Sequence, residues 1–386
     1  MNAKYALLME AKLRKETNAK VLDTRRFMND RIEKANYYGG AMDKLSKMLQ
    51  PYNVVDSVSI LPDFTDANSL PIGVTAVIRP NAAINPALIG MDIGCGYQFF
   101  SADINSKRFY KKDRLKQGGT SMIVGEIDHE IKEGISEPDT SFGTIGRGNH
   151  FIDMFVVEEV FDADVCRRAG IDPGRVYFLI HSGSREKGFK IHTNFTKEFN
   201  ALNGGDVSRF NYNYLTAFKQ AKDYARGNRD KLREDVIKAI GGYSAVNPNL
   251  LFDKSHNDIQ VMADGNIKLK KGTSSLAPGE VFVIPGTAVD SSYMVVGEEG
   301  LKDSNNTINH GAGRTYTREQ IFCKFRRKNF DNLFRDVVLN VPVSQMIEEI
   351  PKGYKNIEDI IDSVEQFKLA RRIVKLKPVG VIVERK

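Results

Sequence analysis

The chain has little cysteine and no long apolar segment. Its 386 residues include only Cys95, Cys166 and Cys323, which is too few for a disulfide framework. No apolar run approaches the ~20 residues needed to cross a bilayer. Residues 1–20 are charged and helix-prone, without the apolar centre of a signal peptide. These features predict a cytoplasmic protein that does not enter a membrane.

Internal repeats, low-complexity tracts and Pro- or Ser-rich linkers are also lacking, which favours one continuous domain. Hydrophobic residues make up 41% of the chain and charged residues 27%, a balance typical of a folded globular protein. The net charge is +7 and the isoelectric point is near 9.0. This charge permits an anionic partner such as RNA, but many proteins without such a partner are equally basic.

Hydrophobic patterning predicts an α+β fold of β-sheets flanked by helices. Residues 1–50 are charged and helix-like, and we interpret them as an N-terminal helical extension. Residues 51–386 alternate short β-rich segments with helical ones and form the main domain. The segments with the clearest patterns are strands at 74–78, 176–180 and 281–284, helices at 209–240 and 331–372, and a final strand at 380–383.

Four of the six histidines stand in glycine-rich or polar turns beside strand-like runs. A single histidine of this kind is more often a hydrogen-bonded structural residue than a ligand. Four in such contexts indicate a site, because glycine lets the backbone approach a bound group closely. The four are His150, after a glycine-rich approach, His181, in His-Ser-Gly-Ser-Arg, His256, followed by Asn, and His310, in His-Gly-Ala-Gly-Arg.

A carboxylate and a thiol lie three residues apart in the segment Asp-Ile-Gly-Cys-Gly, at Asp92 and Cys95. A thiolate between glycines can reach a metal ion without crowding. A buried cysteine in a tight turn with a capping Asp explains the same pattern. Together with His150, His181 and His256, the pair would form a mixed ligand set that suits zinc, manganese or iron. Five ligands exceed the need of one tetrahedral ion, whereas two ions sharing the thiolate would use them all.

Four cationic residues lie close in sequence to these motifs. Arginine binds phosphate oxygens in a bidentate manner, and a glycine-rich turn presents backbone N–H groups to them. Any one of these cations could be a solvated surface charge. Their positions beside the histidine motifs favour a phosphate-binding role for Arg185, Lys271, Arg314 and Arg318.

Taken in order, the motifs resemble those of the RNA-splicing ligases known as RtcB. The resemblance covers about Leu61 to Arg318, and one motif at Tyr354-Lys matches more loosely. The matching segments are Asp92-Ile-Gly-Cys-Gly, Gly148-Asn-His-Phe, His181-Ser-Gly-Ser-Arg, His256-Asn, Lys271-Gly, Ile284-Pro-Gly, Ser292-Tyr and His310-Gly-Ala-Gly-Arg.

The resemblance implies a single ligase domain around a central cleft for metal and nucleotide. His310 would attack the α-phosphate of GTP and carry GMP covalently. GMP would pass to an RNA 3′-phosphate, itself released from a 2′,3′-cyclic phosphate by hydrolysis, and a 5′-hydroxyl would then displace GMP. This chemistry serves RNA repair or tRNA splicing, and an archease-type activator could assist it. Two Mn²⁺ ions would be held by Asp92, Cys95, His150, His181 and His256.

The resemblance also implies which residues hold the nucleotide. Phosphates of GTP or of the RNA ends would contact the four cations named above. The guanosine would contact Asn149, Asp153, Ser292, Ala312, Gly313, Tyr354 and Lys386.

Three departures from the family pattern suggest a divergent paralogue. Pro62-Asp63-Phe64-Thr65 keeps the Asp of the usual Pro-Asp-Val-His but loses the His and the following Gly-Lys-Gly, which would reshape how the RNA 3′ end is received. Asp153 replaces a guanine-contacting Glu and is one methylene shorter. Val383 aligns with a C-terminal lysine, so Lys386 would have to substitute for it.

Two other functions stay open at this stage. A metal-dependent phosphohydrolase or cyclic phosphodiesterase would have kept the metals but lost nucleotide transfer, and it would act on cyclic-phosphate RNA ends without GTP. A non-catalytic RNA-binding protein would use its metal only for folding. The intact metal-ligand motifs and the intact His310 motif favour the ligase.

Overall fold

The computed structural model describes most of the chain. The described ranges are 20–35, 40–52, 54–79, 83–108, 119–134, 141–241 and 247–384. Lys386, which the sequence suggests as a nucleotide ligand, lies outside them.

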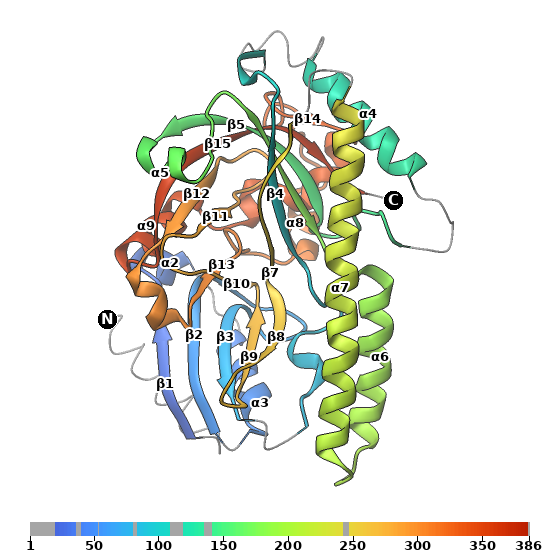
Figure 1. The fold of residues 1–386 in the computed structure, drawn as a ribbon, viewed down its shortest axis with the longest axis vertical. Coiled ribbons are helices and arrows are strands. Elements are labelled where there is room, and N and C mark those ends of the chain that lie inside the picture. Colours follow the sequence, from blue (N-terminus) through green and yellow to red (C-terminus); the bar gives the residue numbers. More distant parts are fainter. Residues whose placement is uncertain are drawn as a thin grey trace.

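The larger of two main sheets occupies the upper half of the molecule (Figure 1). Its strands pair antiparallel in the order β11-β12-β15-β5-β6-β4-β7, and β14 adds to β15 in parallel. Strands β4 and β6 are buried along their whole length. The bounds are β4 (Gly96–Ala102), β5 (Phe151–Val160), β6 (Val176–Ser182), β7 (Asn249–Ser255), β11 (Val281–Ile284), β12 (Ser292–Gly297), β14 (Val338–Leu339) and β15 (Ala370–Ile382).

The second sheet lies in the lower half and has the strand order β1-β2-β3-β9-β8 (Figure 1). All its pairings are antiparallel except that of β1 with β2. A two-stranded ribbon of β10 and β13 lies between the two sheets in this view. The bounds are β1 (Lys20–Arg26), β2 (Val54–Thr65), β3 (Ile72–Ile78), β8 (Asn257–Val261), β9 (Ile267–Lys271), β10 (Thr273–Ser275) and β13 (Thr307–Asn309).

One long helix, α7 (Val207–Ile240), runs along the side of both halves, with α4 (Gly119–Glu133) and α6 (Arg185–Ala201) packed on it (Figure 1). Its C-terminal part buries Leu232 and Val236 in the cluster that α4 and the large sheet share. No helix of the described ranges is both long and apolar enough to cross a bilayer. The other helices are α2 (Asp30–Ala35), α3 (Ala41–Leu49), α5 (Ala163–Arg168), α8 (Arg318–Phe325), α9 (Ile357–Gln366) and the 3₁₀ turns η1 (Pro86–Leu88), η2 (Ser106–Arg108), η4 (Glu299–Ser304), η5 (Val343–Glu349) and η6 (Pro351–Gly353).

The α+β fold class predicted from the sequence is confirmed, as are the strands near 74–78, 176–180 and 281–284 and the long helix. Two local predictions were wrong. Within residues 1–50, which were expected to be helical, Lys20–Arg26 is a strand that pairs with β2, because tertiary pairing overrides weak local preference. Within residues 331–372 only α9 is a regular helix, since Pro342 and Pro351 restrict the residues before them and break the segment into 3₁₀ turns.

Candidate metal centre and nucleotide pocket

The five predicted metal ligands meet at the start of β4. Cys95 directly precedes this strand, and Asp92 lies in the turn that leads into it. His181 lies on β6, which pairs with β4, and His150 directly precedes β5, whose first residue pairs with His181. His256 directly follows β7, whose last residue pairs with the first residue of β4. The antiparallel register therefore brings residues from four distant segments to one end of the sheet.

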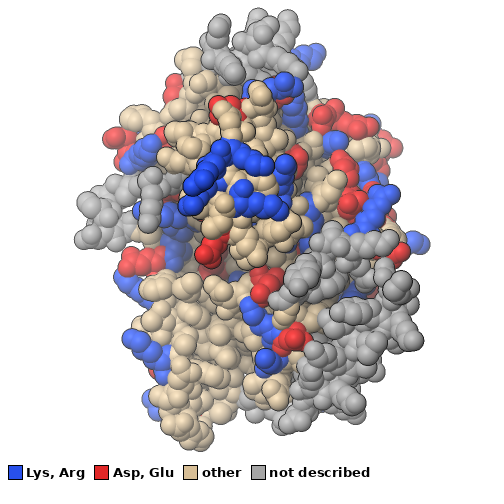
Figure 2. All heavy atoms as spheres, turned by 180° about the vertical axis from the view of Figure 1, so that it is seen from behind, with Lys and Arg blue, Asp and Glu red and all other residues tan. Residues whose placement is uncertain are grey.

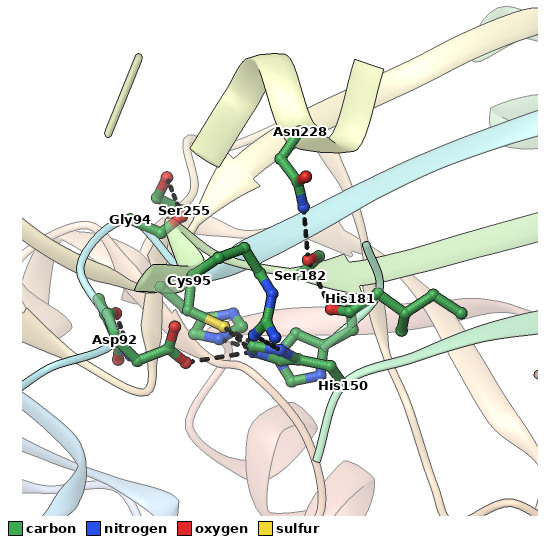
Figure 3. Close-up of polar contacts among 12 residues, drawn as sticks. Asp92, Gly94, Cys95, His150, His181, Ser182, Asn228 and Ser255 are labelled. Atoms are coloured by element: carbon green, nitrogen blue, oxygen red, sulfur yellow. Dashed lines mark hydrogen bonds and ion pairs between the residues drawn. The ribbon is translucent and has the colours of Figure 1, made fainter. Parts of the chain in front are cut away.

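The ligand atoms form two overlapping groups that share the Cys95 sulfur (Figure 3). His181 Nε2 lies 3.1 Å from this sulfur and His150 Nε2 lies 3.3 Å from it. Asp92 Oδ2 is 3.2 Å from His150 Nε2, and the Nε2 atoms of His181 and His256 are 3.3 Å apart. One group is Cys95, His181 and His256, and the other is Asp92, Cys95 and His150, with all ligand atoms of a group within 4.8 Å of one another.

The chemistry of this donor set fits divalent transition-metal ions. Sulfur, imidazole nitrogen and carboxylate oxygen converge in a largely buried place, where facing lone pairs repel one another unless a proton or a metal cation lies between them. An all-oxygen set, which calcium and magnesium favour, is not what these residues offer. The overlap at Cys95 is what two neighbouring ions bridged by one thiolate require.

Burial determines which ligands carry protons. It lowers the pKa of His181 and His256 well below the usual range, so both are neutral at pH 7, the form that binds metals. Burial, reinforced by Asp92, raises the pKa of the Cys95 thiol. A cation is therefore needed to displace the thiol proton. For Asp92 burial acts to raise the pKa, but His150 and the hydrogen bond with Cys95 outweigh it and lower the pKa.

Asn228 of α7 holds two of the ligand-bearing segments together (Figure 3). Its side-chain amide donates to Ser182 Oγ at 2.9 Å and to the Thr144 carbonyl at 3.0 Å. Its oxygen accepts from the Gly143 amide at 2.7 Å. Asn228 thus links the residue after His181 to the loop that precedes His150.

Arg229, the next residue, holds the backbone directly before Cys95 in place. Its Nη1 donates to the carbonyls of Gly94 and Ser182, both at 3.0 Å. Its Nη2 lies 2.6 Å from Asp253 Oδ1, in an ion pair whose arginine side chain is 1% exposed. Sequence reasoning missed Asn228 and Arg229, because both lie inside an ordinary helical pattern. The only local signal was that two adjacent polar residues, Asn228 and Arg229, stand among the positions of α7 that are buried.

His310 lies beside the metal-ligand cluster, directly after β13. Its ring centroid is 4.6 Å from that of His256, and its side chain is 14% exposed. His310 Nδ1 lies 2.7 Å from Oδ2 of Asp63, which is fully buried. A carboxylate only accepts hydrogen bonds, so Nδ1 carries a proton, and in the neutral ring Nε2 keeps its lone pair. The geometry thus directs the His310 ring so that Nε2 is the nitrogen not engaged by Asp63.

Asp63 is itself held by a buried lysine that sequence reasoning missed. Lys355 Nζ donates to the carbonyls on either side of Asp63, those of Pro62 at 2.8 Å and Phe64 at 2.7 Å. Burial lowers the pKa of Lys355 to about 7, with the charge of Asp63 acting in the opposite direction. Gly313 also packs against Asp63, since a Cβ there would lie 2.4 Å from the Asp63 carbonyl oxygen. The only sequence signal for Lys355 was the loose match at Tyr354-Lys.

A cavity of about 210 Å³ opens beside His310, and a second of about 370 Å³ lies by the metal ligands. Both have His310 and Asn149 in their walls. The first is mainly apolar. Of the residues expected to hold nucleotide, it is lined by Asn149, Asp153, Ala312, Gly313, Arg314, Arg318 and Tyr354.

Comparison with known proteins gives the chain its family. A sequence model of the family described as tRNA-splicing ligase RtcB matches residues 120–384, which is more than half of the chain. The chain belongs to the RtcB family. Its matched range includes His150, His181, His256 and His310, whereas Asp92 and Cys95 precede it.

Individual RtcB relatives are distant in sequence. The tRNA-splicing ligase RtcB of Nanoarchaeum equitans is 23% identical over 85% of this chain and 88% of its own length. The tRNA-splicing ligase RtcB of Pyrococcus abyssi is 24% identical over 70% of this chain and 34% of its own length. The RNA-splicing ligase RtcB of Mycobacterium bovis is 27% identical over 70% of this chain and 71% of its own length.

Three of the residues expected to contact the nucleotide do not line the first cavity. Lys271 lines the second cavity and donates to the Ile89 carbonyl at 2.8 Å. Arg185 Nη1 lies 3.3 Å from His150 Nδ1, on the side of that ligand away from Cys95. Ser292 is buried, and its Oγ accepts from the Gly286 amide at 3.1 Å, at the rim of the first cavity.

The two arginines of the first cavity are paired with carboxylates of η5. Arg314 Nη1 donates to Tyr354 Oη at 2.6 Å and lies 3.4 Å from Glu349 Oε2. Arg318 Nε lies 3.3 Å from Glu349 Oε1 and 3.7 Å from Glu348 Oε2. An incoming phosphate would have to compete with these carboxylates for the guanidinium groups.

Asp153 forms an isolated carboxyl in the wall of the first cavity. It is 5% exposed, and its Oδ1 has no hydrogen-bond partner among the described residues. Burial raises the pKa of Asp153 well above its usual range. In its protonated form this carboxyl can both donate and accept a hydrogen bond.

Replacing Arg229 by Met should destabilise the fold and weaken metal binding together. Asp253 would keep a buried charge without its partner, which costs about 3–5 kcal/mol, and Gly94 would lose its anchor. Arg233→Met, on the same helix, removes a half-exposed pair with Asp230 and should cost about 0–1 kcal/mol. Urea unfolding of chelator-treated protein and Mn²⁺ titration measure the two effects, and equal losses in both variants would contradict this role of Arg229.

Replacing Cys95 by Ala should reduce bound Mn²⁺ more than replacing His256 by Ala. Cys95 belongs to both ligand groups, whereas His256→Ala leaves Asp92, Cys95 and His150 intact. We expect the His256 variant to keep one of two ions and the Cys95 variant to keep fewer. Metal analysis after equilibrium dialysis checks this, and equal metal content in the two variants would show that the thiol is not shared.

Proposed function

We propose that this RtcB-family protein is a GTP- and Mn²⁺-dependent ligase that joins RNA 3′-phosphate or 2′,3′-cyclic phosphate ends to 5′-hydroxyl ends, in RNA repair or tRNA splicing. The observation that carries the proposal is the position of His310. It lies between a buried carboxylate and a convergent set of metal ligands, in the walls of two cavities. The names of the relatives, tRNA-splicing and RNA-splicing ligase, support an RNA substrate.

The first step would use His310 Nε2 as a nucleophile. Its lone pair attacks the α-phosphorus of GTP, the new N–P bond forms and pyrophosphate leaves. Asp63, which accepts a hydrogen bond from Nδ1–H at 2.7 Å, stabilises the positive charge that develops on the ring. The buried Lys355 keeps the Asp63 backbone in place during this change of charge.

The metal ligands lie where phosphate charge would accumulate. Asp92, Cys95, His150, His181 and His256 would hold two divalent ions, and these would neutralise the phosphates beside His310. Arg185 and Lys271, on two sides of the cluster, add positive charge for the triphosphate or for the RNA ends.

The two cavities suggest how GMP is handed over. The first would hold the guanosine, through Asn149, Asp153, Ser292, Ala312, Gly313 and Tyr354, with Lys386 as a further candidate. The second, which shares His310, would admit the RNA 3′-phosphate. An oxygen of this phosphate attacks the phosphorus of the His310 adduct and frees the imidazole. A 5′-hydroxyl then attacks the RNA 3′-phosphorus, and GMP leaves as the strands join.

One observation favours the alternative of a cyclic phosphodiesterase that has lost nucleotide transfer. Val383, which aligns with the lysine expected at the C-terminus, is buried in the wall of the first cavity and offers the nucleotide no charge there. In that case cyclic-phosphate RNA ends would be opened without GTP, and His310 would be dispensable.

Labelling with GTP distinguishes the two functions. Incubation with Mn²⁺ and α-labelled GTP should leave an acid-labile label on the protein, reduced to background in His310→Ala. His129→Ala, which changes an exposed histidine of α4, should label like the wild type. An unlabelled wild type whose cyclic-phosphate opening survives His310→Ala would establish the alternative.

Asp63→Asn should slow adduct formation without removing metal. The asparagine amide can donate to His310 Nδ1, which favours the tautomer with its proton on Nε2 and removes the nucleophilic lone pair. We expect a loss of about 10³- to 10⁴-fold, as for the comparable substitution in Ser-His-Asp enzymes. Single-turnover labelling measures the rate and metal analysis provides the control. A wild-type labelling rate in this variant would show that Asp63 does not set the tautomer.

A further inference from the structure

Helix α8 leads away from the first cavity. Its first residue, Arg318, lines that cavity, and its eight residues extend about 12 Å at about 1.5 Å per residue. Ile321 and Phe325 on its inner face are buried in the cluster that also contains Met346, another residue of the cavity wall. The outer face of α8 therefore has a fixed position relative to the candidate site.

Positive charge is concentrated at the C-terminal end of α8 and in the turn after it. Lys324, Arg326, Arg327 and Lys328 are all exposed, and the sequence from residue 320 to 330 contains no acidic residue. Arg318 pairs with carboxylates of η5, but none of these four cations forms an ion pair within the described ranges. Seen from behind, Lys and Arg side chains gather in one group on the upper half of the molecule, at the height of α8 in Figure 1 (Figure 2).

Two exposed aromatic rings lie among these cations. Tyr316 is 41% exposed and Phe322 is 42% exposed. Lys324 Nζ lies 4.9 Å from the Tyr316 ring centroid, and Arg326 Cζ lies 5.9 Å from that of Phe322. Aromatic and guanidinium planes stack on unpaired bases, while the neighbouring cations attract the phosphate backbone. A purely basic surface would lack this preference for unpaired bases.

We propose that this surface binds the single-stranded RNA segment that leads into the candidate site. We call it the α8 patch, and it consists of Tyr316, Phe322, Lys324, Arg326, Arg327 and Lys328. The inference rests on the proposed function, because it takes the substrate to be RNA. It adds the path of the RNA, which runs from Arg318 along the outer face of α8.

The first test compares two fourfold variants of equal charge change. One replaces the four cations of the α8 patch by Ala, and the other replaces exposed cations of α5, α6 and α7, namely Arg167, Arg168, Lys197 and Lys219. Fluorescence anisotropy with a 3′-phosphorylated single-stranded RNA should show at least about tenfold weaker binding for the patch variant alone. In the patch variant, the slope of log Kd against log salt concentration should decrease by about 3, because four phosphate contacts of about 0.7 each are lost. Equal affinities in the two variants would overturn the proposal.

The aromatic contribution is tested separately. Phe322→Ala should weaken single-strand binding by about tenfold and leave the salt dependence unchanged, because stacking is lost and charge is not. A blunt duplex of the same length should bind more weakly than the single strand. Tighter duplex binding, with no effect of Phe322→Ala, would contradict recognition of unpaired bases.

Cys323 offers an independent readout on the same face. It is exposed, whereas Cys95 and Cys166 are buried, so a maleimide should modify it first. Single-stranded RNA should slow this modification several-fold in the wild type and much less in the fourfold patch variant. Labelling of His310 by GTP needs no RNA and should be equal in all variants. If the wild type takes no label from GTP while RNA still slows the modification of Cys323, the proposed ligase function is rejected and RNA binding by the α8 patch is retained.

Discussion

One buried sulfur atom is the point on which the candidate centre depends. The Cys95 thiol lies within 3.3 Å of imidazoles from two different segments and belongs to both ligand groups. Bringing so many donor atoms together away from water is unfavourable unless cations balance them. The backbone must therefore hold them from outside, and it does so through the register of β4 with β6 and β7 and through Asn228 and Arg229 of α7.

The same principle extends to the proposed nucleophile. His310 is oriented by Asp63, Asp63 is held by Lys355 through the carbonyls on either side of it, and Gly313 leaves room for that backbone. Asp63 and Lys355 are both buried, whereas His310 is partly exposed. On the cavity side, Glu349 forms ion pairs with Arg314 and Arg318, and Glu348 forms one with Arg318. The Oδ1 atom of Asp153 has no hydrogen-bond partner among the described residues. Asp153 and Val383, two of the departures from the family pattern that the sequence suggests, lie in the wall of the first cavity, and all five candidate metal ligands are present.

The sequence predicts what local context can mark. Glycine turns and short motifs marked five candidate ligands and His310, which the fold brings together, and period-2 and helical patterns predicted the α+β class and α7. It could not predict Arg229, whose hydrogen bond to Gly94 spans 135 residues, or Lys355, whose partners lie more than 290 residues away. It also missed β1, because an edge strand is specified by its partner. Ion pairs such as Arg314–Glu349 depend on helix η5, which the sequence placed in a regular helix.

The wide sequence separation of the ligands has a consequence for how the protein matures. Residues 92 and 256 belong to segments that the pairing of β4 with β7 and the bond of Arg229 to Gly94 bring together, so the five candidate ligands converge only when these elements have assembled. Non-local pairings of this kind form late and slowly. Metal would therefore bind to a nearly folded chain rather than nucleate its folding. A shortage of metal would leave folded protein that lacks its metal centre.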